Sequence, residues 1–162
     1  MKNQLIIIFL DKIFQKIHNI GIDTTNLTLD HIGYQASSSA DYEKIKAEWT
    51  QKYELVGENI VGGRRVLNIR LDEPFKYKTY QFEFVELIEP KPEQVVQSDW
   101  EHIEMTVDCS LEAFMERYPK LDWNTKAIDR EDFPMITLKL DANLQVKFPR
   151  NGVQHEINKD KE

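Results

Sequence analysis

The sequence contains a single cysteine, Cys109, so no disulfide can form within the chain. We therefore expect a fold that depends on its hydrophobic core and a reducing, cytoplasmic location. The longest apolar run, Leu5 to Leu10, is far shorter than the roughly 20 residues that a membrane-spanning helix needs. Lys2 is the only basic residue before this run, and no small-residue cleavage site follows it. We therefore expect neither a signal peptide nor a membrane anchor.

Positive charge is also scarce. The chain has 21 Lys and Arg residues against 28 Asp and Glu residues, a formal net charge of −7. Such a chain repels phosphate backbones at long range, so we do not expect it to bind nucleic acid or an anionic membrane. It also lacks a phosphate-binding loop, a dinucleotide fingerprint and a paired-cysteine zinc motif.

The length of 162 residues fits one domain preceded by a helix. Apolar residues at helical spacing predict a helix from Gln4 to Ile20, which Gly21 ends. We interpret residues 1–26 as a helical segment docked on a domain of residues 27–157. Ile7 and Ile8 widen the apolar face of this helix, so it is either deeply buried, which we favour, or it contacts a partner such as a second copy of the chain.

The rest of the chain indicates two copies of one strand–helix–three-strand unit. Three local patterns recur in the same order: His31-Ile32 is matched by His102-Ile103, Leu67–Asp72 by Ile136–Asp141, and Gln81–Phe84 by Gln145–Phe148. The separation within each pair shrinks slowly along the chain, as expected if the second copy has shorter turns. We place the first module at about residues 27–89 and the second at about residues 98–150. The proline-containing stretch Glu89–Pro92 lies between them, as expected of a linker.

Alternation of side chains across the predicted strands points His31 and His102 into one concavity, opposite an apolar face. Among the carboxylates we favour Glu86 as the one that faces the same way. Two imidazoles and a carboxylate on a rigid sheet are the ligand set of a divalent metal: zinc, iron(II), manganese or nickel. A second interpretation, of about equal weight, is two separate histidines hydrogen-bonded to their neighbours.

The same alternation predicts residues that bind substrate. Asn68 and Arg70 share one face of their strand, and Lys139 has the corresponding place in the second module. Cations beside a metal attract a small anionic substrate. The alternative is a solvated outer face, which we weigh equally for Arg70 and favour slightly for Lys139. Glu104 shares a face with His102 and is our candidate general base, unless it pairs with Arg70 or Lys139 instead.

The chain also resembles a known family. A series of short segments in this order closely resembles the YecM family of bacterial proteins: Asp30-His31-Ile32, Gly57–Ile60, Asp72-Glu73-Pro74, Tyr80-Gln81-Phe82, Val85-Glu86-Leu87, Trp100–Glu104 and Val146-Lys147-Phe148. The resemblance runs from about Leu27 to Ile157. It places the chain in the vicinal oxygen chelate superfamily, together with glyoxalase I, bleomycin-resistance proteins and extradiol dioxygenases.

The resemblance implies an α+β fold of paired βαβββ modules that form a curved, mixed and mostly antiparallel sheet around a central pocket. It also implies that His31, Glu86 and His102 are metal ligands. Glyoxalase-like members carry a fourth ligand, a glutamate, on the last strand, but here Gln145–Arg150 offers no acidic residue. The site is therefore either a three-ligand centre or a cavity that has lost its metal.

Two functions remain open at this point. The first is a metal-dependent lyase, isomerase or dioxygenase that acts on a small oxygenated, anionic substrate, with Glu104 as its base. The second is a protein that binds or sequesters a small molecule without catalysis, with or without a metal. Drug-binding members of the superfamily form a dimeric groove, so the second function would favour a homodimer.

Overall fold

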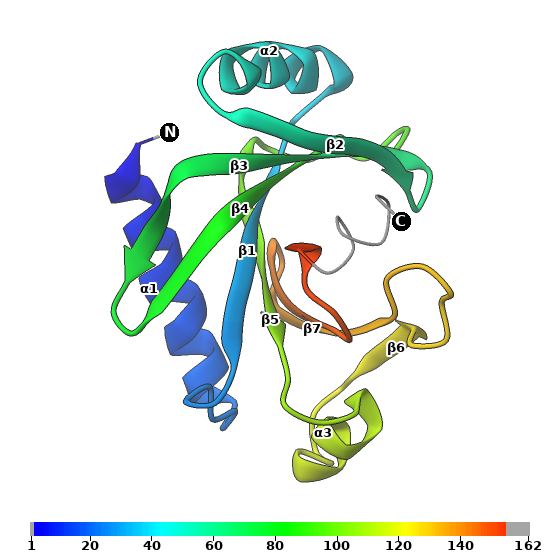
Figure 1. Ribbon diagram of the computed structural model, residues 1–162. Helices are drawn as coiled ribbons and strands as arrows, with labels where there is room; N and C mark the ends of the chain where they lie inside the picture. The colour runs from blue at the N-terminus through cyan, green and yellow to red at the C-terminus, as the bar shows by residue number, and fades with distance from the viewer. Residues whose placement is uncertain (1, 155–162) are drawn as a thin grey trace.

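A single curved sheet of eight strands organises the chain, with its helices on the outer side (Figure 1). The inner side of the sheet lines a pocket. The computed structural model describes residues 2–154, so the last three residues of the predicted domain, 155–157, lie outside the described part. The elements follow in chain order: α1 (Asn3–Asn19), β1 (Thr28–Gln35), α2 (Ser39–Thr50), β2 (Glu54–Val61), β3 (Arg64–Tyr77), β4 (Tyr80–Ile88), β5 (Asp99–Thr106), α3 (Leu111–Arg117), β6 (Asn124–Ala127), β7 (Met135–Asp141) and β8 (Leu144–Pro149).

The order of strands in the sheet is β2-β3-β4-β1-β5-β8-β7-β6. Strand β1 runs parallel to β4 and β5 runs parallel to β8, while the other neighbours are antiparallel. Each half is therefore one strand, one helix and three strands, and the two halves meet at β1 and β5. The predicted α+β fold with two βαβββ modules and a mixed, mostly antiparallel sheet is confirmed.

The pairing of β1 with β5 has a local twofold symmetry. Ile32 lies opposite Ile103, and on either side His31 lies opposite Glu104 and Gly33 lies opposite His102. His31 and His102 therefore occupy equivalent places, as the sequence repeat predicts.

The predicted match between β3 and β7 is also confirmed. Asn68 on β3 lies opposite Glu86 on β4, and its match Thr137 on β7 lies opposite Lys147 on β8. Glu86 and Lys147 are in turn equivalent positions of the two modules, as the pairing with the central strands shows.

The third predicted match, which aligns Gln81 with Gln145, is wrong. His31 pairs with Phe84 and His102 pairs with Gln145, so Phe84 is the true equivalent of Gln145. The positions 81 and 84 differ by an odd number, and an odd shift moves every side chain to the opposite face of a sheet. The residue equivalent to Glu86 is consequently Lys147.

Helix α1 crosses the outer side of the sheet and contacts both modules. Its buried face consists of Ile6, Phe9, Leu10, Ile13 and Ile17. The Phe9 ring lies 5.9 Å from that of Trp100 on β5, and the Phe14 ring lies 4.8 Å from that of Tyr80 on β4. The helix therefore packs within its own chain, while Leu5, Ile7 and Ile8 stay at the surface.

Helices α2 and α3 begin at serine caps. The hydroxyl oxygens of Ser38 and Ser110 accept hydrogen bonds from the backbone N–H groups of Asp41 and Ala113, each at 3.1 Å. Packing of the helices against one side leaves the other side of the sheet free to form a pocket. Within residues 2–154, none of the helices combines the length and apolar character that crossing a bilayer demands.

The packing of α1 predicts a clear contrast between two substitutions in one helix. Leu10→Ala removes a fully buried side chain and should lower the free energy of unfolding by about 2–5 kcal/mol. Ile8→Ala removes a side chain that is 57% exposed and should change it by less than about 0.5 kcal/mol. Urea unfolding of the full chain measures both, and equal losses would show that the helix does not pack as described.

Candidate metal centre

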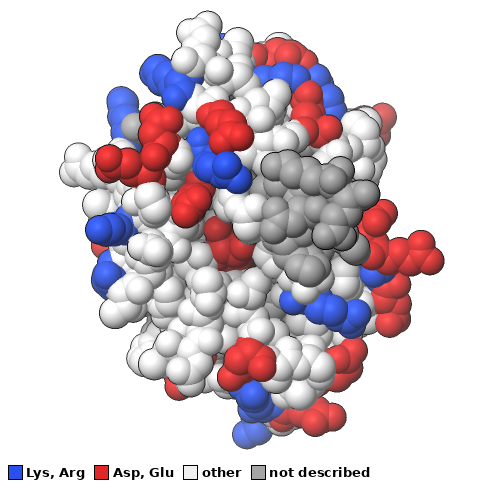
Figure 2. All heavy atoms as spheres, in the orientation of Figure 1, with Lys and Arg blue, Asp and Glu red and all other residues white. Residues whose placement is uncertain are grey.

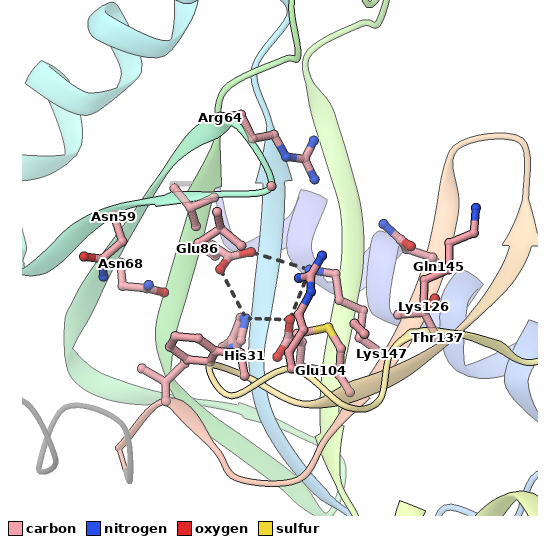
Figure 3. Close-up of a pocket in the computed structure, with 18 of the residues that line it drawn as sticks. His31, Asn59, Arg64, Asn68, Glu86, Glu104, Lys126, Thr137, Gln145 and Lys147 are labelled. Carbon is pink, nitrogen blue, oxygen red and sulfur yellow. Dashed lines mark hydrogen bonds and ion pairs between the residues drawn. The ribbon is translucent and has the colours of Figure 1, made fainter.

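Four ionisable side chains from the three central strands meet in the hollow of the sheet. They are His31 on β1, Glu86 on β4, and His102 and Glu104 on β5, and their ligand atoms all lie within 4.8 Å of one another. Figure 3 shows His31, Glu86 and Glu104 of this cluster. His102 Nε2 lies 3.2 Å from Glu86 Oε2, and His31 Nε2 lies 3.6 Å from Glu104 Oε1. The structure thus brings His31, Glu86 and His102 together as predicted, and Glu104 joins them.

Strand register explains why these four side chains converge. His102 lies opposite Gly33, and a Cβ atom added to Gly33 would be 2.1 Å from His102 Cε1. The imidazole of His102 therefore occupies the space that any larger residue at position 33 would fill. Both histidines are almost completely buried, at 1% exposure for His31 and 0% for His102.

Each histidine is held by a carboxylate on its other ring nitrogen. His31 Nδ1 lies 2.8 Å from Asp30 Oδ2, and His102 Nδ1 lies 2.7 Å from Glu101 Oε2. Asp30 Oδ2 also accepts a hydrogen bond from the backbone N–H of Val153 at 3.0 Å. A carboxylate on Nδ1 favours the tautomer whose Nε2 lone pair is free, which is the usual arrangement of metal-binding histidines.

Electrostatics around the pair favours positive charge. Burial alone would raise the pKa of Glu101, but the neighbouring His102 and Lys147 outweigh it and lower this pKa to about 2. Burial alone would lower the pKa of His31, yet Glu104, Asp30 and Glu86 raise it to about 9. The carboxylates of this centre therefore stabilise any cation that enters it.

Lys147 already brings a cation to the centre. Its ammonium group lies 3.0 Å from both Glu104 Oε1 and His102 Nε2, and 3.7 Å from Glu86 Oε2. Burial opposes the charge of Lys147, but Glu104 and Glu86 outweigh this effect and raise its pKa. Lys147 acts on Glu86 in return. Burial would raise the pKa of Glu86, yet Lys147 and the two histidines lower it. Glu104 thus pairs with Lys147, and the predicted partners Arg70 and Lys139 are wrong.

The side chains fit a divalent metal. His31 Nε2 is buried and makes no hydrogen bond with a described residue, so it can bind a metal that displaces the proton favoured by the raised pKa of His31. Two imidazoles and one or two carboxylates match the ligands of zinc, iron(II), manganese and nickel. Binding of such an ion to His102 Nε2 requires the Lys147 ammonium to move aside.

The predicted substrate residues divide into two groups. Asn68 lines a cavity of about 340 Å³ above the centre, as does its equivalent Thr137. Arg70 and Lys139 each stand two residues further along the same strands, a displacement of about 7 Å, and neither lines this cavity. Arg70 instead pairs with Glu54 at 3.1 Å, and Lys139 lines a separate hollow.

Sequence reasoning missed five basic residues that do line the cavity: Arg64, Lys91, Lys126, Arg130 and Lys147. Lys147 lies on the same face of β8 as Gln145, and it is the equivalent of Glu86 on β4. A correct alignment of these two strands in the sequence would therefore have identified Lys147 as a residue of the site. The other four lie at strand ends, in the β4–β5 connection or in the β6–β7 loop, where no periodic pattern indicates which way a side chain points.

Comparison with known proteins identifies relatives of the chain. The family model described as "YecM protein" matches residues 3–159. The chain is 31% identical over 109 residues to Protein YecM of Escherichia coli, a match that covers 67% of this chain and 58% of that protein. An uncharacterized protein of Haemophilus influenzae is 27% identical over 100 residues, which is 62% of this chain and 52% of that one. The chain thus spans little more than half the length of these curated relatives.

Solved structures share the fold. A structure described as "Structural Genomics, Protein EC4020" has a TM-score of 0.77 at 24% identity and covers 94% of this chain and 87% of its own. Methylmalonyl-CoA epimerase from Mycobacterium tuberculosis has a TM-score of 0.56 at 16% identity, covering 86% and 99%. The Streptomyces coelicolor epimerase in complex with 2-nitronate-propionyl-CoA has a TM-score of 0.53 at 16% identity, covering 76% and 96%. The predicted vicinal oxygen chelate fold is confirmed.

The close approach at Gly33 can be tested without any ligand. Gly33→Ala should displace the His102 imidazole and lower the free energy of unfolding by about 1–3 kcal/mol, because the added methyl group overlaps a buried ring. Gly57→Ala is the matched control in a strand, since its Cβ would lie 3.9 Å from the nearest atom. Urea unfolding gives the energies, and the His102 ring resonances in an NMR spectrum should shift only in the first variant.

Proposed function

The chain belongs to the YecM family, and on this premise we propose that it is a metal-dependent enzyme of the lyase or isomerase type. Its substrate would be a small, oxygenated anion, and its metal ligands would be His31, Glu86 and His102. The observation that carries the proposal is the buried cluster itself, in which two carboxylate-oriented imidazoles direct Nε2 atoms toward Glu86 and Glu104. Burial of four such groups without a function would only cost stability.

A bound divalent cation would supply Lewis acidity that stabilises negative charge developing on a substrate oxygen. The protein residues would do the rest. Glu104 Oε1 would take a proton from one position of the substrate and return it to another, and the Lys147 ammonium group, at 3.0 Å from that oxygen, would keep the carboxylate ionised before each transfer. Val66, Phe133 and Met135 add apolar surface to the cavity, which limits the access of water.

Proton transfer is favoured over oxygen chemistry within this proposal. The cluster places the Glu104 carboxylate and the Lys147 ammonium group 3.0 Å apart, beside the proposed metal ligands, and these two groups form an acid–base pair. The structural relatives named above include epimerases, whose name denotes isomerisation. These observations support a lyase or an isomerase more than they support a dioxygenase.

Metal analysis tests the proposal directly. Protein purified without a histidine tag and incubated with Zn²⁺, Fe²⁺, Mn²⁺ or Ni²⁺ should retain about one ion per chain after desalting, as measured by mass spectrometry of the metal. His31→Ala and His102→Ala should each retain much less, because each removes one imidazole ligand. His18→Ala, on the exposed side of α1, should behave as the parent protein does.

An equal metal content in all four proteins would place the ion elsewhere and reject the proposed centre. Loss in His18→Ala alone would have the same meaning. Circular dichroism of each variant shows whether the loss of metal accompanies unfolding.

Lys147 gives a second test, because its ammonium group competes with a metal for the same ligands. Lys147→Met should bind metal at least about tenfold more tightly than the parent, which corresponds to about 1.4 kcal/mol. Lys147→Arg keeps the charge and should bind no better than the parent. Competition with a chromophoric chelator measures these affinities, and weaker binding by Lys147→Met would show that the lysine supports the metal instead of opposing it.

The alternative function is a binding protein without catalysis, and Lys147 is the observation that favours it. A lysine stands at the position equivalent to Glu86 and already neutralises the two carboxylates. If this ammonium group permanently replaces the metal, the parent protein will bind none of the four ions after reconstitution, and small anions will bind to the metal-free cavity.

A further inference from the structure

We propose that the mouth of the cavity contains an oxyanion-binding subsite formed by Arg64, Lys126 and Arg130. It would hold a second anionic group of the substrate, at the end remote from the proposed metal. This proposal rests on the proposed function for the role of the other end, but the subsite itself can bind an anion whether or not a metal is present.

Charge is distributed unevenly along the cavity wall. The two acidic residues among the described lining residues are Glu86 and Glu104, both in the cluster at the base. The other charged lining residues are all basic: Arg64, Lys91, Lys126, Arg130 and Lys147. The chain as a whole is acidic, with a net charge of −7, and Figure 2 shows both signs interspersed over the face it presents. Basic residues are therefore concentrated at this cavity, against the overall composition.

Arg64 is positioned by a buried partner. It follows the turn Gly62-Gly63, whose φ angles of 59° and 80° suit glycine, and so begins β3 at the edge of the cavity. Arg64 Nη1 donates a hydrogen bond to Gln35 Oε1 at 3.1 Å. Gln35 is only 4% exposed, and its own Nε2 donates to the carbonyl oxygens of Ala36 and Ile88. The guanidinium group is thus held over the cavity by a fixed side chain (Figure 3).

Lys126 and Arg130 approach from the second module. Lys126 lies on β6 and Arg130 lies in the loop that follows it, and Figure 3 shows Lys126 across the cavity from Arg64. Within residues 2–154, no carboxylate lies within ion-pair distance of Arg64, Lys126 or Arg130. By contrast, Arg65 pairs with Glu43 and Glu89, and Arg70 pairs with Glu54. Among the described residues, the cations at the mouth therefore differ from the neighbouring arginines in having no carboxylate partner.

This arrangement defines the chemistry of the ligand. A guanidinium group binds two oxygens of a carboxylate or phosphate at once, while an ammonium group adds a point charge. Cations from both modules can surround an oxyanion that enters between them. The substrate would then have an oxygenated end that reaches the centre and a carboxylate or phosphate that stays at the mouth.

Binding of orthophosphate and of acetate tests the subsite. Isothermal titration calorimetry should detect one binding event on the metal-free protein, weakened at least tenfold in the double variant Arg64→Gln/Arg130→Gln. The control is Lys120→Gln/Lys139→Gln, which removes the same charge from exposed positions outside this cavity. A preference for phosphate assigns the remote group as a phosphate, and comparable binding of acetate assigns it as a carboxylate.

The outcomes separate this proposal from the proposed function. Anion binding that persists when no metal can be loaded supports the subsite and rejects the enzyme proposal. If the protein binds a metal but neither orthophosphate nor acetate, the subsite is rejected and the proposed metal centre is unaffected. Equal weakening by the control variant shows only general charge attraction and overturns the subsite. A titration repeated on the metal-loaded protein should give the same dependence on Arg64 and Arg130.

Discussion

The antiparallel contact between β1 and β5 is the constraint on which the rest of the structure depends. With Ile32 opposite Ile103, the two halves of the chain are related by a local twofold axis, and the two histidines fall on one side of the sheet. The parallel strands β4 and β8 then bring Glu86 and Lys147 to equivalent places beside them. A shift of one residue in this contact would turn one of the two imidazoles to the helical side and abolish the site.

The symmetry of the backbone contrasts with the asymmetry of the side chains. Gly33 and Glu104 are equivalent positions, as are Glu86 and Lys147, yet in each pair the residues differ in charge or size. Gly33 makes room for His102, and Lys147 balances the two carboxylates. Because unpaired buried charges are strongly destabilising, this balance is what allows so many ionisable groups to share one small space.

Much of this could be predicted from the sequence, because strand alternation is a local property. It placed His31, His102, Glu104 and Asn68 on the correct face, and repetition in the chain indicated the two modules. Alternation does not tell how far along a strand the cavity extends, so Arg70 and Lys139 were included although they lie one step beyond it. The position of Lys147 depends on the register between β5 and β8, and that of Arg64 on a turn and on contact with Gln35, which only the folded chain reveals.

Asp30 connects the candidate centre to a distant part of the chain. Its carboxylate both orients His31 and accepts the N–H of Val153, and a side chain at Gly152 would collide with it. Val153 thus helps to orient this imidazole, through Asp30, from a distant position in the sequence. A substitution at Gly152 would therefore disturb the orientation of His31 through Asp30, although Gly152 itself lies outside the cluster.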